Sequence, residues 1–203
     1  MFTLVVQDHM SAPAITAWTD TEVGEAIRTI RARHVHYLLV VDVHYKLVGI
    51  VTSRDLEDCA TMDPVGAHMT PSPHTTTPDT TLVQAATKMR DLHVGALPVL
   101  DHGELVGIIT ASDIFDGFLE LLGTRRPGTR VVVPLRTVVH DMPELLAAVA
   151  RTRVPITGLT TLGDGHCVWA ILNFDTVDPA AVTGALNSAG FPPAQVDILA
   201  VAA

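Results

Sequence analysis

The stretch Gly49-Ile50-Val51-Thr52-Ser53-Arg54-Asp55 returns later in the chain as Gly107-Ile108-Ile109-Thr110-Ala111-Ser112-Asp113. Both stretches read glycine, two apolar residues, threonine, two variable residues and aspartate. The similarity reaches back to Met10 and Met69, so that residues 10–55 and 69–113 follow one pattern. A duplication of this length indicates two copies of one supersecondary unit, each unable to bury its apolar face alone. Two copies also predict two related clefts, and we expect function to reside there.

The first copy has the pattern of a helix, a β-hairpin and a further helix. Asp20 and Thr21 are N-cap candidates for a helix whose apolar residues recur at helical spacing. Two runs of β-branched and apolar residues, 37–42 and 47–52, predict the strands of a hairpin. A second helix is expected over residues 53–59, with the aspartate of the repeated motif in its first turn.

The second copy repeats this order. Asp79 and Thr80 are the corresponding cap candidates, again followed by apolar residues at helical spacing. Strands are expected at residues 96–100 and 105–110, and a helix at 112–122. The proline-rich and hydroxyl-rich stretch between the copies is predicted to be an extended connection that keeps them together.

A third pattern follows a change of composition at residues 124–129, which we expect to be a linker. The expected elements then run strand, helix, strand, strand, helix, strand. They cover residues 130–139, 143–151, 156–162, 166–174, 179–189 and 196–201, with a hairpin turn at Gly163-Asp164-Gly165. The order βαββαβ predicts a ferredoxin-like split arrangement.

Composition excludes several classes of protein. With 48% hydrophobic residues in a 203-residue chain, the sequence is typical of a globular protein. Its apolar runs are far shorter than the ~20 residues of a membrane span, and its start lacks the features of a secretory signal, so we expect a soluble, cytoplasmic protein with no membrane partner. A net charge of -9 argues against nucleic acid as a partner. Cys59 and Cys167 lack metal-ligand spacing and are expected to be reduced thiols.

The repeated motif combines three features that suit a nucleoside. A helix that starts after a strand offers unpaired backbone N–H groups and partial positive charge to a phosphate. A carboxylate in its first turn, Asp55 or Asp113, can accept hydrogen bonds from the two hydroxyl groups of a ribose. Thr52 and Thr110 add a hydroxyl group at the same place. Either aspartate alone would be explained as a helix N-terminal carboxylate, but two in matching motifs favour a ligand-binding role.

These residues resemble those of tandem CBS domains, the regulatory pair called a Bateman module. The resemblance covers residues 10–122 and is carried by GIVTSRD and GIITASD, by the preceding LLVVD and LPVLD, and by the Met-Ser-Ala-Pro and Met-Thr-Pro-Ser segments that lead into the copies. It implies an α/β (α+β) fold in which two CBS repeats pack as a pseudo-two-fold pair. It also implies adenosine-type ligands such as AMP, ADP, ATP or S-adenosylmethionine, with no required cofactor.

The resemblance also implies roles for individual residues. It places Asp55 and Asp113 on the ribose, and Arg54 and Ser112 within reach of phosphates. The bulk of His36-Tyr37, where the second copy has Gly95-Ala96, is expected to narrow the first cleft. The expected ligand-binding residues are Ile15, Thr16, Ala17, His36, Tyr37, Leu38, Leu39, Thr52, Arg54, Asp55, His74, Thr75, Thr76, Gly95, Ala96, Leu97, Pro98, Thr110, Ser112 and Asp113.

The tail resembles an ACT domain, and the order CBS-CBS-ACT resembles acetoin-utilisation-type regulatory proteins. ACT domains typically have a glycine in the turn into their first helix, where we place Glu144. A glutamate side chain there argues against amino-acid binding and favours a role in dimerisation. The expected domains are residues 1–68 and 69–123 for the CBS repeats and 130–203 for the ACT-like domain.

The sequence therefore favours a non-catalytic regulatory protein, a homodimer that senses an adenine nucleotide and signals by conformational change to a regulated enzyme. No nucleophile or phosphate-loop motif indicates catalysis. The histidines of the two copies lack the carboxylate or cysteine that would complete a metal site. One alternative is a ligand-free scaffold with vestigial clefts, and another, ranked last, is an enzyme acting on a nucleotide.

Overall fold

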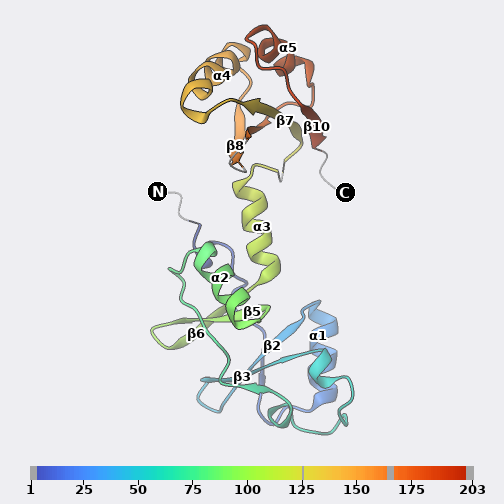
Figure 1. Cartoon of the computed structure of the whole chain (residues 1–203). Helices are drawn as coiled ribbons and strands as arrows, with labels where there is room; N and C mark the ends of the chain where they lie inside the picture. Colours follow the sequence, from blue (N-terminus) through green and yellow to red (C-terminus); the bar gives the residue numbers. More distant parts are fainter. Residues whose placement is uncertain (1–3, 125, 164–166, 200–203) are drawn as a thin grey trace. The chain divides into compact units, whose positions relative to one another are not determined.

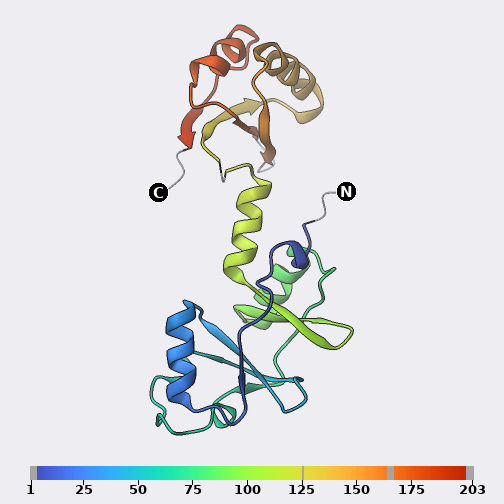
Figure 2. The same ribbon diagram turned by 180° about the vertical axis from the view of Figure 1, so that it is seen from behind.

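A computed structural model describes residues 4–124, 126–163 and 167–199 of the chain. These residues form two compact units that divide between Gly117 and Phe118, within one continuous helix. Figures 1 and 2 show the chain from opposite sides, coloured from blue at the N-terminus to red at the C-terminus. Each unit has its own mixed α/β core, and the two are described separately below.

The first unit contains both copies of the repeat. In the first copy, α1 (Val23–Arg33) packs beside the strands of a four-stranded sheet (Figure 1). The strands run in the order β1 (Thr16–Trp18), β2 (Tyr37–Val41), β3 (Leu47–Thr52) and β4 (Thr70–Pro71). In the second copy, α2 (Leu82–Leu92) and α3 (Ala111–Leu121) accompany the hairpin of β5 (Ala96–Asp101) and β6 (Glu104–Thr110).

Each copy is completed by the segment that leads into the other. β4 lies at the start of the second copy in sequence but pairs with β3 of the first copy. Conversely, Ser11 lies at the start of the first copy and exchanges backbone hydrogen bonds of 2.9 and 3.0 Å with Ile108 of the second. Figure 2 shows the N-terminal segment running along the second copy before it joins the first. The two copies are thereby interlocked.

Two glycines of the repeated motif leave room for the leading segment of the opposite copy. A Cβ atom at Gly107 would lie 2.9 Å from the sulfur of Met10, and one at Gly49 would overlap the sulfur of Met69. Real Cβ atoms do not approach other heavy atoms so closely. The repeated methionine of each leading segment therefore rests on the repeated glycine of the opposite copy.

The core lies between α1 and its sheet and continues across the junction of the copies. Val23, Ala26 and Ile30 of α1 pack against buried residues of β2 and β3. At the junction, Leu39 of the first copy packs with Ala96 and Ile108 of the second. Burial of a leucine or isoleucine side chain contributes about 1.5–3 kcal/mol, so the copies stabilise one another.

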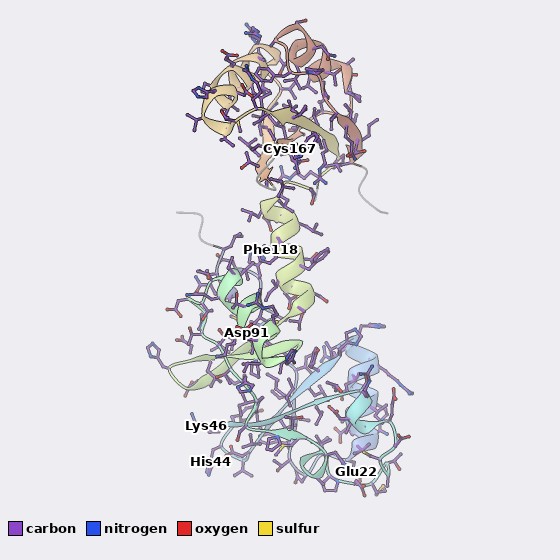
Figure 3. The ribbon with its side chains drawn as sticks, viewed as in Figure 1. Glu22, His44, Lys46, Asp91, Phe118 and Cys167 are labelled. Carbon is purple, nitrogen blue, oxygen red and sulfur yellow. The ribbon has the colours of Figure 1, made fainter. Side chains whose placement is uncertain are left out.

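The helix starts differ from those expected. The N-cap of α1 is Glu22 (Figure 3), which makes no side-chain capping bond, rather than Asp20 or Thr21. The N-cap of α2 is Thr81, rather than Asp79 or Thr80. Its hydroxyl group accepts from the Gln84 backbone, and the Gln84 side chain accepts from the Thr81 backbone. This reciprocal pair is a capping box, which the sequence Thr81-x-x-Gln84 contains.

The expected helix over residues 53–59 is wrong. Only a short 3-10 turn forms there, at Arg54–Leu56, whereas the second copy continues into the three turns of α3. In α3, Ile114 is buried and Phe118 follows it four residues later (Figure 3), so the helix has an apolar side to pack. The first copy lacks an apolar run after Leu56 and soon reaches Pro64.

The second unit has the expected βαββαβ order. Its antiparallel sheet runs β10-β7-β9-β8, and both helices pack on one face of it (Figure 1). The core contains Leu145 of α4, Leu186 of α5 and Phe174 of β9. The elements are β7 (Gly128–Leu135), α4 (Val138–Thr152), β8 (Ile156–Gly163), β9 (Val168–Phe174), α5 (Ala180–Ser188) and β10 (Gln195–Leu199).

The boundaries of the first strand and helix in this unit differ from the expected ones. The strand ends at Leu135 rather than residue 139, because the hydroxyl group of Thr137 caps α4. Pro143 therefore lies inside α4, and Glu144 is an exposed residue of that helix. The turn from strand to helix is Arg136-Thr137, so the argument that Glu144 crowds this turn is wrong. The predicted hairpin residues 164–165 lie outside the described residues.

Candidate functional site

The two motif aspartates have the same local geometry. The backbone N–H of Thr110 donates to Oδ2 of Asp113 at 2.8 Å, and the Thr110 hydroxyl group donates to the same oxygen at 2.7 Å. In the first copy, Thr52 donates to Asp55 Oδ2 at 2.7 and 2.8 Å through the same two groups. In both copies the aspartate N–H donates back to the threonine hydroxyl at 3.3 Å.

This arrangement fixes one carboxylate oxygen and leaves the other available. Oδ2 of Asp113 accepts both hydrogen bonds from Thr110, while its Oδ1 has no hydrogen-bond partner within the described residues. An oriented carboxylate with one open oxygen can accept hydrogen bonds from hydroxyl groups of a ligand, and bonds to a charged acceptor are the stronger kind. The threonine thus serves to orient the aspartate.

Asp113 lines a cleft of about 650 Å³ at the junction of the two copies. One side of the cleft is the leading segment, residues 10–15, and another is the start of β2 with residues 34–37. The second copy supplies Gly95, Ile108 and residues 110–113. The volume falls within the range of roughly 300–1,000 Å³ that small-molecule sites occupy.

The cleft is built from both copies. The carboxylate comes from the second copy, whereas His36 and Tyr37 come from the first. The phenol oxygen of Tyr37 lies against Gly95, where a Cβ atom would overlap it. The bulk at Tyr37 therefore shapes the cleft of Asp113 rather than that of Asp55.

The start of α3 faces this cleft. The N–H of Ala111 donates to the carbonyl of Gly95 at 2.9 Å, and that of Asp113 donates to Thr110. Between them, the N–H of Ser112 has no partner in the part of the chain that the structure describes. A free N–H in the first turn of a helix, together with the helix dipole, favours an anionic group of a ligand.

The structure brings only some of the predicted site residues together. Those that line the Asp113 cleft are Ile15, His36, Tyr37, Gly95, Thr110, Ser112 and Asp113. Those whose side chains are buried in the core are Ala17, Leu38, Leu39, Ala96, Leu97 and Pro98. In this structure the side chains of these residues pack in the core.

The remaining predicted residues lie elsewhere. Thr75 and Thr76 line an open groove of about 550 Å³ together with Lys88, whose ammonium group donates to the Thr75 carbonyl at 2.5 Å. Thr16 lines a smaller cavity of about 230 Å³ beside the hairpin residues His44 and Lys46, labelled in Figure 3. The other four, which line neither of these cavities nor the Asp113 cleft, are Thr52, Arg54, Asp55 and His74.

Several lining residues were not predicted from sequence. They are Met10 to Ala14 of the leading segment, His34, Val35, Ile108 and Ala111. The repeated methionine and the repeated glycine were both visible in the sequence. Their contact across the copies would have placed the leading segment beside Asp113.

Comparison with known proteins identifies the fold of the first unit. A protein-family model for the CBS domain matches residues 6–59 and 65–120, more than half of the chain. The chain belongs to the CBS domain family. The two matched stretches correspond to the two copies of the repeat, so the first unit is a CBS pair.

Among curated relatives, a CBS domain-containing protein of Dictyostelium discoideum is 34% identical over 137 residues, covering 59% of this chain and 94% of that protein. The L-aspartate semialdehyde sulfurtransferase of Methanocaldococcus jannaschii is 33% identical over 113 residues, covering 54% of this chain but only 22% of the enzyme. The chain therefore matches only part of that larger enzyme.

Solved structures show the same fold. The CBS domain pair of protein MJ0100, in complex with 5'-methylthioadenosine and S-adenosyl-L-methionine, has 32% identity and a TM-score of 0.54, covering 57% of this chain and 96% of that one. CBSX2 in complex with AMP has 26% identity and a TM-score of 0.53, covering 58% and 97%. A Vibrio cholerae protein assigned to acetoin utilization (AcuB) has 29% identity and a TM-score of 0.54, covering 60% and 94%.

Within the described residues, no group of three or more histidine, cysteine, aspartate or glutamate side chains is arranged to hold a metal ion. Within the same residues, every helix is too short or too polar to cross a bilayer.

Proposed function

We propose that this chain is a non-catalytic regulatory protein whose CBS pair binds an adenosine-containing ligand in the Asp113 cleft. The observation that carries the proposal is the oriented carboxylate of Asp113, whose open Oδ1 belongs to a cleft of suitable volume. The ribose hydroxyl groups donate to Oδ1, and the base lies against the apolar residues of the cleft. Adenosine ligands in the similar structures support this choice of ligand class.

Regulation requires that the ligand favour one conformation over another. The cleft is suited to this, because its walls come from both copies and from the leading segment. A ligand that contacts all three stabilises one arrangement of the interlocked pair. A match to one part of a larger enzyme supports the further proposal that the pair regulates an enzyme.

We assign the second unit to the ACT-like class on its βαββαβ order and propose that it forms a homodimer. Similarity of the CBS pair to a protein assigned to acetoin utilization supports a role in that process. The turn Arg136-Thr137 has no glycine, and Arg136 forms an ion pair with Asp141 of α4, which argues against amino-acid binding at this turn.

A thermal-shift titration tests the ligand class. Adenosine, AMP, ADP, ATP and S-adenosylmethionine are each added to the full chain and to the Asp113→Ala variant. A ligand that binds only the native state stabilises it by about 2.7 kcal/mol at a hundred times its Kd. We expect a shift with at least one compound and its loss in Asp113→Ala. A chain that no compound stabilises would instead be a scaffold with vestigial clefts.

A further inference from the structure

The Asp113 cleft contains no permanent positive charge. Its described lining includes one carboxylate, Asp113, and two imidazoles, His34 and His36, but neither lysine nor arginine. Both histidines are exposed at the rim of the cleft. A ligand with several phosphate groups would therefore bring many negative charges close to a carboxylate without a cation to compensate them. Proteins that hold di- and triphosphates use lysine, arginine or metal ions for this purpose.

The two repeated motifs differ in charge at one position. The residue before the motif aspartate is Arg54 in the first copy and Ser112 in the second. Only the serine lines the 650 Å³ cleft. Ser112 lies in the first turn of α3, where its hydroxyl group and its free N–H can bind one phosphate group. These neutral donors do not balance the charge of a longer phosphate chain.

We propose that the Asp113 cleft selects adenosine compounds that carry no more than one phosphate group, and that Ser112 sets this limit. This inference rests on the proposed function and specifies the ligand class of the same cleft. A single phosphate lies at the N-terminus of α3, while an uncharged 5' substituent lies against apolar residues of the cleft. ADP and ATP place further negative charge in a cleft whose described lining has neither lysine nor arginine.

Isothermal titration of the full chain with adenosine, AMP and ATP, without added metal ions, tests the inference. We expect AMP to bind at least about tenfold more tightly than ATP, a difference of about 1.4 kcal/mol. Ser112→Arg installs the residue of the first copy at this position. It should reduce the preference for AMP over ATP at least about fivefold while leaving adenosine binding nearly unchanged. Ser112→Lys, with a different cationic side chain, should act in the same direction.

The matched control is Val83→Arg, which adds the same charge at an exposed position of α2 outside the cleft. It should leave the ratio of the AMP and ATP affinities as in the unaltered chain. Equal affinity for AMP and ATP, or equal effects of Ser112→Arg and Val83→Arg, would overturn the inference while adenosine-ligand binding still stands. Failure of every compound to bind, or binding that Asp113→Ala does not weaken, would overturn the proposed function and this inference with it.

Discussion

The phenol oxygen of Tyr37 occupies the space that a Cβ atom at Gly95 would need, and the ring carbon Cζ lies 3.6 Å from that Cβ position. The conflict therefore involves the oxygen atom alone, because 3.6 Å is an ordinary van der Waals distance. Tyr37 belongs to the first CBS copy and Gly95 to the second, and both line the Asp113 cleft. The contact between these two residues therefore contributes both to the packing of the two copies and to the shape of the cleft.

Gly95→Ala should therefore destabilise the chain and weaken ligand binding. Displacing the Tyr37 ring costs about 1–2 kcal/mol, within the range for overpacked sites. Tyr37→Phe removes the oxygen and should restore most of the stability in the double variant. Urea unfolding of the unaltered chain, the two single variants and the double variant measures the coupling free energy between the two positions. A double variant as unstable as Gly95→Ala would show that the phenol oxygen is not the obstacle.

The α1 helix can be stabilised by one substitution. Glu22 has the extended backbone of an N-cap but makes no side-chain capping bond, and Glu25 stands at the third helical position. Glu22→Thr creates the capping-box pattern that Thr81 and Gln84 already form at α2. We expect a gain of about 0.5–1 kcal/mol in the free energy of unfolding.

The reverse change at α2 provides the comparison. Thr81→Ala should cost about 1 kcal/mol, whereas Thr81→Ser keeps the hydroxyl oxygen and should cost less. Urea unfolding of the full chain measures the free energy of unfolding of the variants at both helices. A Glu22→Thr variant no more stable than the unaltered chain would contradict the account of this helix start.

The second unit should lose stability in acid through Asp141. This buried carboxylate accepts from the Arg136 backbone N–H at 2.6 Å and from the Arg136 guanidinium at 2.5 Å. The guanidinium holds the pKa of Asp141 below its ordinary value of 3.8. Between the lowered pKa of the folded state and the ordinary value of 3.8, the folded unit therefore binds fewer protons than the unfolded chain. The stabilisation is fully present above pH 3.8 and is lost as the pH falls through the lowered pKa of the folded state.

Asp141→Asn tests this because the amide cannot ionise. The variant should be less stable than the unaltered chain at neutral pH, and the two should converge in acid. The slope of the free energy of unfolding against pH should differ between Asp141→Asn and the unaltered chain by an amount equivalent to up to about one bound proton per chain. The control is Asp175→Asn, an exposed carboxylate of the same unit. Parallel pH profiles for Asp141→Asn and the unaltered chain would contradict the assignment.

Much of the CBS pair was predictable because local pattern and burial agree there. The strand expected at residues 47–52 is confirmed as β3, Leu47–Thr52, whose apolar residues alternate between buried and partly buried positions. The tail order βαββαβ is also confirmed. The helix starts were less predictable, since several hydroxyl or acidic residues precede each helix and only the backbone conformation decides which one caps it.

The composition of the cleft was not predictable from either copy alone. The leading segments exchange between the copies, so the residues around Asp113 come from positions near 10, 35, 95 and 110 of the chain. Local spacing cannot reveal contacts between such distant segments. Sequence pattern also could not show that Leu38 and Leu97 are fully buried, because an apolar strand residue can equally face a core or a ligand.

The stoichiometry of AMP binding tests the central claim most directly. Equilibrium dialysis is carried out on the full chain, on Asp113→Ala and on Asp55→Ala, whose aspartates make the same hydrogen bonds to their threonines. We predict one AMP per chain, lost in Asp113→Ala and retained in Asp55→Ala. Loss of AMP in Asp55→Ala with retention in Asp113→Ala would contradict the assignment of the ligand to the Asp113 cleft.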